Sequence, residues 1–282
     1  MATPQPLTGL KNIAPYVAGE SELTGFNRVI KLASNEGALG PSKQVLAALA
    51  SRSHEFFRYP DGDCTELREL LANKNGLSKD NIICGAGSDE LINLLCRSYA
   101  GPGDEILYSA HGFAMYPIYG RTVCATVIAA PENDITVDVD QLLRHVTEKT
   151  KLLFIANPNN PTGTYIPKSE IRRLIDLLPK TVLLVLDAAY SEFVGREDYS
   201  DGMEFVAKHE NVVMLRTFSK IYGMAGLRLG WMYAPDGITD IINRMRSPFN
   251  VSYSAIVAGI AAMKDDEFLL MSQKHNKKWL EW

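Results

Sequence analysis

The sequence has little cysteine, no surplus of positive charge and no long apolar run. Four cysteines occur in 282 residues and none forms a Cys-x-x-Cys pair, which argues against a disulfide framework. Twenty-nine Lys and Arg against 33 Asp and Glu give a net charge of −4, so nothing indicates a nucleic acid as partner. The most apolar run, 255–263, is about half of the ~20 residues that a membrane span needs. We therefore expect a cytoplasmic protein without a membrane partner.

The order of apolar and polar segments predicts an α/β fold. With 46% hydrophobic residues, the chain can bury one large core, or one core and part of another. Short β-rich runs alternate with helical patterns, and several of these runs are continuously apolar, as in strands that are covered on both faces. The runs are 81–84, 105–108, 122–128, 151–155, 182–186, 212–215 and 227–233. In a mostly parallel sheet of this kind, ligands bind at the carboxyl ends of the strands.

Two motifs that follow such runs suit an anion and amide donors. Gly85-Ala86-Gly87-Ser88 opens a helix, and glycines at a helix N-terminus let the backbone approach a phosphate. A plain strand–helix turn is the alternative, and the third glycine of a dinucleotide fingerprint is missing. In the segment 157–163, prolines bracket two asparagines, which predicts a rigid loop that holds amide side chains at a strand end.

Two further motifs supply a carboxylate and an amine. Asp187 ends the most apolar run, where a carboxylate is costly unless it is paired with a cation or caps a helix. Lys220 lies among hydroxyls and glycines, with Arg228 eight residues later, whereas most lysines are solvated surface charges. Together the four motifs meet the needs of pyridoxal phosphate. The amine would form a Schiff base with its aldehyde, and the carboxylate would keep its pyridine nitrogen protonated.

These motifs resemble those of fold-type I pyridoxal-phosphate aminotransferases, and within that family the histidinol-phosphate subgroup. The resemblance covers nearly the whole chain and is most specific in the segments 13–19, 31–36, 58–62, 157–163 and 216–231. It implies an α/β fold whose large domain is a mostly parallel sheet sandwiched by helices, with a smaller α/β domain that looks truncated. The expected divisions are an N-terminal arm with part of the small domain (1–40), the large cofactor-binding domain (41–248) and the incomplete start of a C-terminal small domain (249–282).

The resemblance implies roles for individual residues. Lys220 would hold the cofactor and move the proton, Asp187 would pair with the pyridine nitrogen, and Tyr190 with Asn160 would hydrogen-bond the phenolic oxygen of the ring. Other cofactor contacts are assigned to Gly85, Ala86, Gly87, Ser88, Phe113, Thr217, Ser219, Arg228 and, across a homodimer interface, Tyr59. Substrate contacts are assigned to Tyr16, again across the dimer, Asn35 and Asn160, and no residue is assigned to a metal.

The resemblance also implies a reaction. Amino transfer from L-histidinol phosphate to 2-oxoglutarate would give imidazole-acetol phosphate and L-glutamate, a step of histidine biosynthesis. An aromatic aminotransferase and a threonine-phosphate decarboxylase of the same fold remain open, and Gly85-x-Gly87 leaves a nicotinamide dehydrogenase as a more distant alternative. Because relatives continue past Trp282 with an arginine for the substrate anion, a truncated cofactor-binding protein without turnover is a further alternative. Gly37-Ala38, Ala86 and Ala188 depart from the family pattern beside functional positions.

Overall fold

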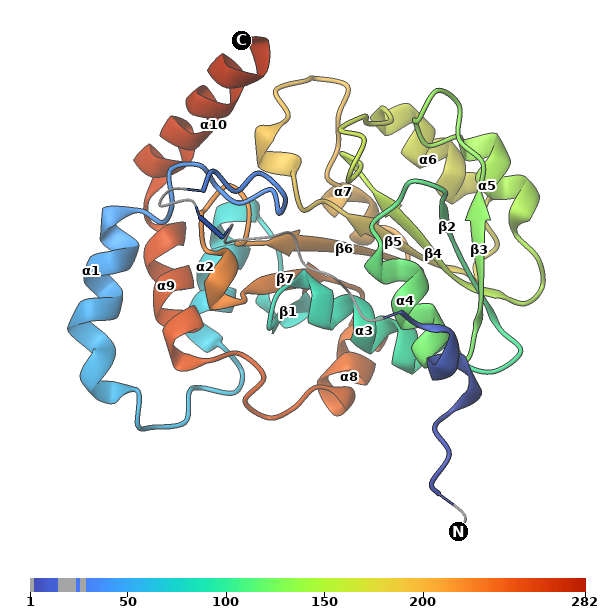
Figure 1. The fold of residues 1–282 in the computed structure, drawn as a ribbon, viewed down its shortest axis with the longest axis horizontal. Coiled ribbons are helices and arrows are strands. Elements are labelled where there is room, and N and C mark those ends of the chain that lie inside the picture. Colours follow the sequence, from blue (N-terminus) through green and yellow to red (C-terminus); the bar gives the residue numbers. More distant parts are fainter. Residues whose placement is uncertain (1–2, 15–23, 26–28) are drawn as a thin grey trace.

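The computed structural model describes residues 3–14, 24–25 and 29–282. Its centre is a seven-stranded sheet with the order β1-β7-β6-β5-β4-β2-β3 (Figure 1). The strands are β1 (Ile82–Gly85), β2 (Glu105–Ser109), β3 (Thr126–Ala130), β4 (Thr150–Ala156), β5 (Leu183–Asp187), β6 (Val212–Thr217) and β7 (Gly230–Tyr233). Only β7 runs antiparallel to its neighbours, β1 and β6. The prediction of a mostly parallel sheet is confirmed.

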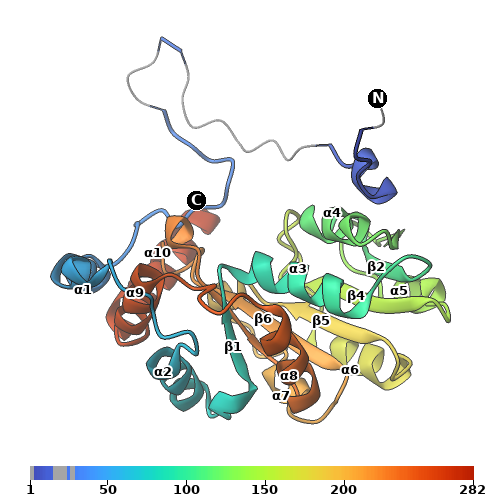
Figure 2. The same ribbon diagram turned by 90° about the horizontal axis from the view of Figure 1, so that it is seen from below.

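Helices cover both faces of the sheet. They are α1 (Lys43–Arg52), α2 (Thr65–Asn75), α3 (Ser88–Tyr99), α4 (Met115–Thr122), α5 (Val139–His145), α6 (Lys168–Leu177), α7 (Met203–Val206), α8 (Asp236–Met245), α9 (Tyr253–Met263) and α10 (Asp266–Glu281). Short 3-10 helices are η1 (Thr8–Asn12), η2 (Ser53–Glu55), η3 (Lys79–Asn81), η4 (Ser191–Phe193) and η5 (Ala225–Leu227). Buried residues of α3, α4 and α8 belong to one core, and those of α2, α5, α6, α7 and α9 belong to the other. In Figure 2, α3 and α4 lie above the sheet and α6 lies below it.

The central strands are apolar because both of their faces are covered. All five positions of β5 are buried. Leu184 and Leu186 join the core beneath α6, whereas Leu183 and Val185 join the core beneath α3. Successive side chains of a strand point to opposite faces, so an uninterrupted apolar run serves both cores. The polar residues at the ends of these strands are thereby held at a rigid edge.

The predicted start of one strand was wrong. The run 122–128 was expected to be a strand, but α4 extends to Thr122 and β3 begins only at Thr126. The turn between them passes through Cys124, whose φ is +60°. A short apolar run does not distinguish a helix end from a strand. The same ambiguity placed the start of β7 at 227, where the structure has the end of η5.

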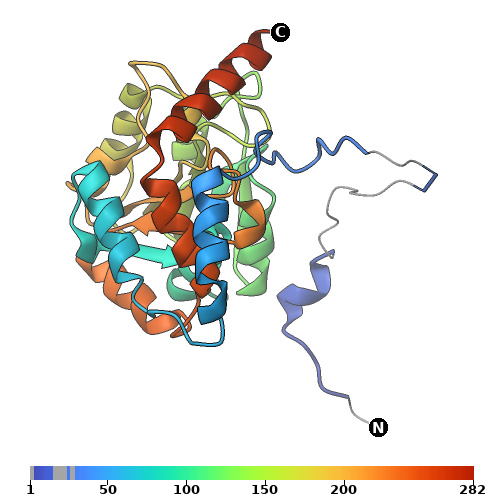
Figure 3. The ribbon, with the colours of Figure 1, turned by 90° about the vertical axis from the view of Figure 1, so that its left-hand side faces the viewer.

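Helices from the two ends of the described chain pack side by side. In Figure 3, α9 lies against α1, and α10 continues beyond them. Ala255 and Ala258 of α9 are buried in the same core as Leu67 of α2. The predicted domain divisions after residues 40 and 248 stay predictions. None of the helices in the described ranges is long and apolar enough to cross a membrane.

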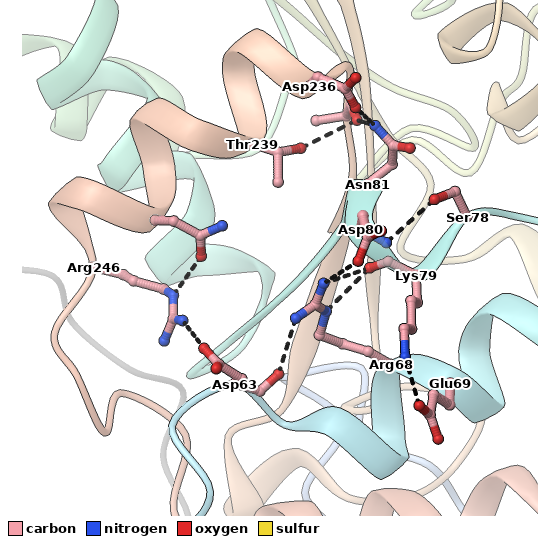
Figure 4. A network of polar contacts seen from close by, with 12 residues as sticks. Asp63, Arg68, Glu69, Ser78, Lys79, Asp80, Asn81, Asp236, Thr239 and Arg246 are labelled. Carbon is pink, nitrogen blue, oxygen red and sulfur yellow. Dashed lines mark hydrogen bonds and ion pairs between the residues drawn. The ribbon is translucent and has the colours of Figure 1, made fainter.

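A polar network fixes the start of β1 against α2 and α8 (Figure 4). Arg68 on α2 donates two hydrogen bonds to a carbonyl oxygen of η3, at 3.1 and 2.7 Å. Arg246, which follows α8, pairs with Asp63 at 3.1 Å, and the Asn81 amide donates to Asp236 at 2.6 Å. Because η3 leads directly into β1, these contacts fix where that strand begins.

Candidate active site

The four motifs singled out in the sequence meet at the carboxyl edge of the sheet. A cleft of about 220 Å³ opens there. It is lined by Ser34, Glu36, Ser88, Asp89, Phe113, Ala156, Asn160, Asp187, Ala189, Tyr190, Thr217, Ser219, Lys220, Ala225 and Arg228. Strands β1, β4, β5 and β6 are neighbours or near neighbours in the sheet, which is why their C-terminal residues converge.

Asp187, the last residue of β5, is a buried carboxylate. Its Oδ2 accepts a 2.8 Å hydrogen bond from the Tyr116 hydroxyl, and its Oδ1 accepts one from the Ala189 backbone N–H at 3.2 Å. Burial raises the pKa of this carboxyl from 3.8 to about 6, although the Tyr116 hydrogen bond lowers it. Within the described residues Asp187 forms no ion pair. A cation bound in the cleft would satisfy it.

Lys220 presents its amine to the same cleft. Its Nζ donates a 3.2 Å hydrogen bond to the Ser34 carbonyl oxygen and lies 5.5 Å from the centre of the Tyr190 ring. Burial lowers the pKa of the Lys220 amine below its ordinary value, and Arg228 lowers it further, while Asp187 opposes this shift. A lowered pKa increases the fraction of neutral, nucleophilic amine at neutral pH.

Tyr190 stands beside Lys220 and is oriented by the N-terminal segment. The Asn35 side-chain amide donates a 3.1 Å hydrogen bond to the Tyr190 hydroxyl oxygen. Asn35 has a φ of +51°, a left-handed conformation that asparagine adopts more easily than most residues. Burial raises the pKa of Tyr190, so its hydroxyl keeps its proton at neutral pH and can donate a hydrogen bond.

An anion site lies where α3 begins. Gly87 precedes α3 with a φ of +84°, and a Cβ atom there would lie 2.4 Å from Nη2 of Arg228. The Arg228 guanidinium therefore stands directly against the glycine turn, and its Nη1 donates to the Ser219 hydroxyl at 3.3 Å. The first N–H groups of a helix have no partner inside it, and they carry positive potential. Ser88, Ser219 and Arg228 thus form a cradle suited to a phosphate group.

Two residues of the predicted phosphate loop lie differently from expectation. The backbone N–H of Ala86 donates to the Glu90 carboxylate at 2.6 Å, so it is directed at α3 and not into the cleft. Gly85 is buried as the last residue of β1 and does not line the cleft. A carboxylate four residues later in the sequence was the clue to this contact, because helix geometry lets it reach back over the turn.

The predicted residues from the N-terminal region are not all part of this cleft. Asn35 contacts Tyr190, as described above, but lines the neighbouring cavity. The Tyr59 ring is 82% exposed and stacks on Phe249 with 4.6 Å between the ring centroids. Tyr16 lies outside the described residues. The contributions of Tyr16 and Tyr59 across a subunit interface therefore stay predictions.

Two polar residues that the sequence analysis missed, together with an asparagine of the predicted amide loop, hold the site in place. Tyr116 orients Asp187, and its only sequence clue is its position three residues after Phe113. Buried Asn159 donates to the His111 carbonyl oxygen at 3.3 Å, which ties the amide loop to the segment that carries Phe113. Glu132 accepts hydrogen bonds from that same segment, including one from the His111 backbone at 3.0 Å.

A second cavity, of about 620 Å³, adjoins the first. Glu36, Asn160, Tyr190 and Lys220 line both, so the Lys220 amine can be reached from the larger space. The larger cavity is otherwise bounded by the segment 35–40, the amide loop, the residues after β5 and one face of α10. This arrangement offers room for a substrate next to the amine.

The chemistry of the cleft fits pyridoxal phosphate. Asp187 is a buried carboxylate without an ion-pair partner among the described residues, and it suits a protonated ring nitrogen. The Arg228 and Ser219 cradle suits a phosphate, and the Phe113 ring lines the cleft where a flat aromatic ring would lie. Lys220, with its lowered pKa, supplies an amine for an aldehyde. A nicotinamide dinucleotide would use neither the buried carboxylate nor the amine in this way.

Comparison with known proteins gives a consistent result. A family model for aminotransferases of class I and II matches residues 27–280. The chain is 53% identical over its whole length to histidinol-phosphate aminotransferase of Paramagnetospirillum magneticum, and covers 78% of that protein. It is 56% identical over 99% of its length to histidinol-phosphate aminotransferase of Rhodospirillum rubrum, and covers 76% of that protein. The crystal structure of histidinol-phosphate aminotransferase from Sinorhizobium meliloti in complex with pyridoxal-5′-phosphate is similar with a TM-score of 0.82 and 31% identity, over 85% of this chain and 65% of that one.

Proposed function

This chain belongs to the family of class I and II aminotransferases, and from that premise we propose that it transfers the amino group of L-histidinol phosphate to 2-oxoglutarate. The products are imidazole-acetol phosphate and L-glutamate, and the cofactor is pyridoxal phosphate. The observation that carries the proposal is the shared cleft, in which the amine of Lys220, the buried carboxylate of Asp187 and the Arg228 cradle face one space. The names of the relatives supply the substrate.

Asp187, Lys220 and the cradle would hold the cofactor. When bound, pyridoxal phosphate supplies an aldehyde that binds amines and a ring that accepts electrons when a proton leaves the neighbouring carbon. Asp187 would gain a cationic partner at the ring nitrogen, which would offset the cost of burying its charge and keep that nitrogen protonated. The Arg228 guanidinium and the hydroxyl of Ser219, which lie 3.3 Å apart, would hold the phosphate end.

Lys220 also moves the proton. As a free amine, Nζ of Lys220 would act in the cleft as a base whose pKa is lowered by burial. It accepts the proton from the substrate carbon and returns it as an acid, and general acid–base help of this kind contributes about 10²–10⁴ in rate. Tyr190 and Asn160 line the same cleft, where the Tyr190 hydroxyl and the Asn160 amide would donate hydrogen bonds to the phenolic oxygen of the cofactor.

The substrate assignment is tested by parallel assays. Relatives that are 53–56% identical are named histidinol-phosphate aminotransferases, which favours this donor over the aromatic and decarboxylating alternatives. We expect amino transfer from histidinol phosphate to 2-oxoglutarate to exceed transfer from phenylalanine, and threonine phosphate to release no CO₂. A higher kcat/KM with phenylalanine, or decarboxylation of threonine phosphate, would replace the proposed substrate by that one.

We also propose a homodimer and a cytoplasmic location. Phe57 is 79% exposed, and exposed Tyr59 stacks on the half-exposed ring of Phe249, so aromatic surface gathers here. A second copy of this chain would cover it and bring Tyr59 to the partner's cofactor. The described cysteines are all free, which suits a reducing compartment.

Subunit mixing tests the shared site. Lys220→Ala and Tyr59→Ala proteins are each inactive or weak if the proposal holds. Mixed dimers of the two would contain one site with both native residues, so activity should return on mixing and rise with time of subunit exchange. A monomer by light scattering, or no recovery in dimers shown to have exchanged, would contradict the shared site.

A further inference from the structure

Arg216 is a buried arginine near the cleft that the proposed mechanism does not use. It lies on β6, four residues before Lys220, and its side chain is 11% exposed. Its Nη2 pairs with Glu192 at 2.7 Å and its Nη1 pairs with Asp201 at 2.7 Å. The guanidinium also lies 5.8 Å from the ring of Trp231 on β7. Three separate segments are thus fixed to one planar group.

Stability alone does not account for this cluster. The Glu192 side chain is 8% exposed, so two charges are removed from water, and well-packed apolar residues often stabilise such a position as well or better. What an arginine provides beyond packing is direction, because its planar fork fixes the orientation of both carboxylates. The segments that carry Glu192 and Asp201 therefore indicate which part of the molecule Arg216 orients.

Glu192 belongs to the segment that carries Tyr190. Tyr190 directly precedes η4, and Glu192 is the central residue of η4. The same short helix is held from the other side by Gln273 of α10, whose amide donates a 2.7 Å hydrogen bond to the Glu192 carbonyl oxygen. Tyr190 in turn lies 5.5 Å from the Lys220 amine. Arg216 is on β6 and Lys220 follows the end of that strand by three residues, so the ion pair with Glu192 ties the segment that carries Tyr190 to the strand that leads to the amine.

We propose that Arg216 is a positioning residue that, through its ion pair with Glu192, holds the Tyr190 hydroxyl at the correct place opposite the Lys220 amine. The inference rests on the proposed function, because the geometry it maintains is that of the cofactor site. Displacement of a group at a reacting centre by about 1 Å can cost about a hundredfold in rate. Arg216 acts on the cofactor only through Tyr190, and it does not itself line the cleft.

The experiment compares Glu192→Gln and Arg216→Lys with Asp201→Asn. Each variant is loaded with pyridoxal phosphate, and its visible absorbance is followed as a function of pH. Loss of the Tyr190 hydrogen bond leaves more negative charge on the phenolic oxygen beside the titrating proton, so the absorbance midpoint should rise by about half a pH unit or more in the first two variants. We expect kcat to fall about tenfold or more, with a smaller change in KM.

Asp201→Asn is the matched control. Asp201 binds the other edge of the guanidinium, in the loop before α7, and asparagine keeps an oxygen that accepts the hydrogen bond. It should lower the melting temperature while leaving the absorbance midpoint in place. Equal midpoints in all three variants and the wild type, with lower melting temperatures, would reduce the cluster to a structural role and overturn the inference.

A double variant separates positioning from a general electrostatic effect. If Arg216 acts through Tyr190, then Glu192→Gln should shift the midpoint far less in a Tyr190→Phe background than in the wild type. Equal shifts in both backgrounds would contradict the inference. The absorbance needs cofactor but no amino donor, so a different substrate would overturn the proposed reaction alone. A wild-type protein that takes up no pyridoxal phosphate would overturn both.

Discussion

The hydroxyl of Tyr116 donates a 2.8 Å hydrogen bond to Oδ2 of Asp187, and both side chains are buried. Tyr116 comes from α4 and is itself fixed by stacking on Phe154 of β4, with ring centroids 4.7 Å apart. The carboxylate is therefore oriented by a group outside its own strand, and it is held as an acceptor whose remaining capacity faces the cleft.

Tyr116→Phe should weaken the cofactor site without disturbing the fold. The change removes a hydrogen bond from a buried carboxylate, and such a loss costs about 1–3 kcal/mol. Because this hydrogen bond lowers the pKa of Asp187, the carboxyl should titrate higher in the variant, and affinity for pyridoxal phosphate should fall about tenfold or more. Cofactor titration by absorbance measures the change. Tyr165→Phe, which loses an exposed 2.9 Å contact to Asp198, should bind cofactor like the wild type.

Asp187→Asn should bind cofactor but lose about a hundredfold or more in kcat, because a neutral amide does not hold a proton on the ring nitrogen. Steady-state assays at saturating cofactor measure this loss. Activity close to that of the wild type would mean that the carboxylate is only structural.

The free energy of unfolding of the cofactor-free protein should depend on pH through the carboxyl group of Asp187. Folding raises the pKa of Asp187 to about 6 from 3.8, so between these values the folded state binds more protons than the unfolded chain. Its contribution to the free energy of unfolding therefore falls as the pH rises through this window, by about 3 kcal/mol in total. Urea unfolding at a series of pH values measures this change. The free energy of unfolding of Asp187→Asn should increase relative to that of the wild type from pH 4 to 6, and the difference should be constant above pH 7. A difference independent of pH would contradict the assigned pKa.

Lys220→Ala should fold normally and lose all turnover. Borohydride reduction of the loaded wild type should attach the cofactor covalently, whereas the variant should remain unlabelled by mass spectrometry. Lys149→Ala removes an exposed lysine elsewhere and serves as the control for labelling and activity. Normal amino transfer by Lys220→Ala would contradict the proposal that the Lys220 amine binds the cofactor and moves the proton.

Arg228→Ala should distinguish the phosphate cradle from the rest of the site. Charge-assisted hydrogen bonds to a phosphate contribute about 1.5–3 kcal/mol, so affinity for pyridoxal phosphate should fall about 10- to 100-fold. Affinity for pyridoxal, which has no phosphate, should change little. An equal loss for both compounds would place Arg228 elsewhere in the site.

Local sequence patterns predicted those features that depend on a single strand or turn. The apolar run 182–186 matches β5 to within one residue. A strand that is buried on both faces is apolar at every position, so such a run marks the strand directly. Asp187 was singled out because a carboxylate at the end of an apolar strand is costly without a partner, and Lys220 because hydroxyls, glycines and Arg228 surround it in the sequence; the structure places both in one cleft. The strand expected at 122–128 was displaced because four residues of similar hydrophobicity end a helix and form a turn there.

Contacts between segments that are distant in the chain could not be predicted from local sequence patterns. Tyr116 binds Asp187 across 71 positions of the chain, and Arg216 binds Glu192 across 24. Neither pair has a spacing that indicates contact, because the sheet order and not the sequence brings them together. The Ala86 N–H was assigned to phosphate by resemblance, although Glu90, four residues later, was a clue that a carboxylate competes for it.

The reversal of β7 fixes the length of the segment before it. Thr217 of β6 is paired with Gly230 of β7, and the intervening residues carry Ser219, Lys220 and Arg228. Gly230 packs so closely on the start of α3 that a Cβ atom there would lie 2.2 Å from the Ser88 nitrogen. A single inserted or deleted residue in 218–229 would move the arginine, the amine or this contact out of register, so we expect this segment to tolerate no change in length.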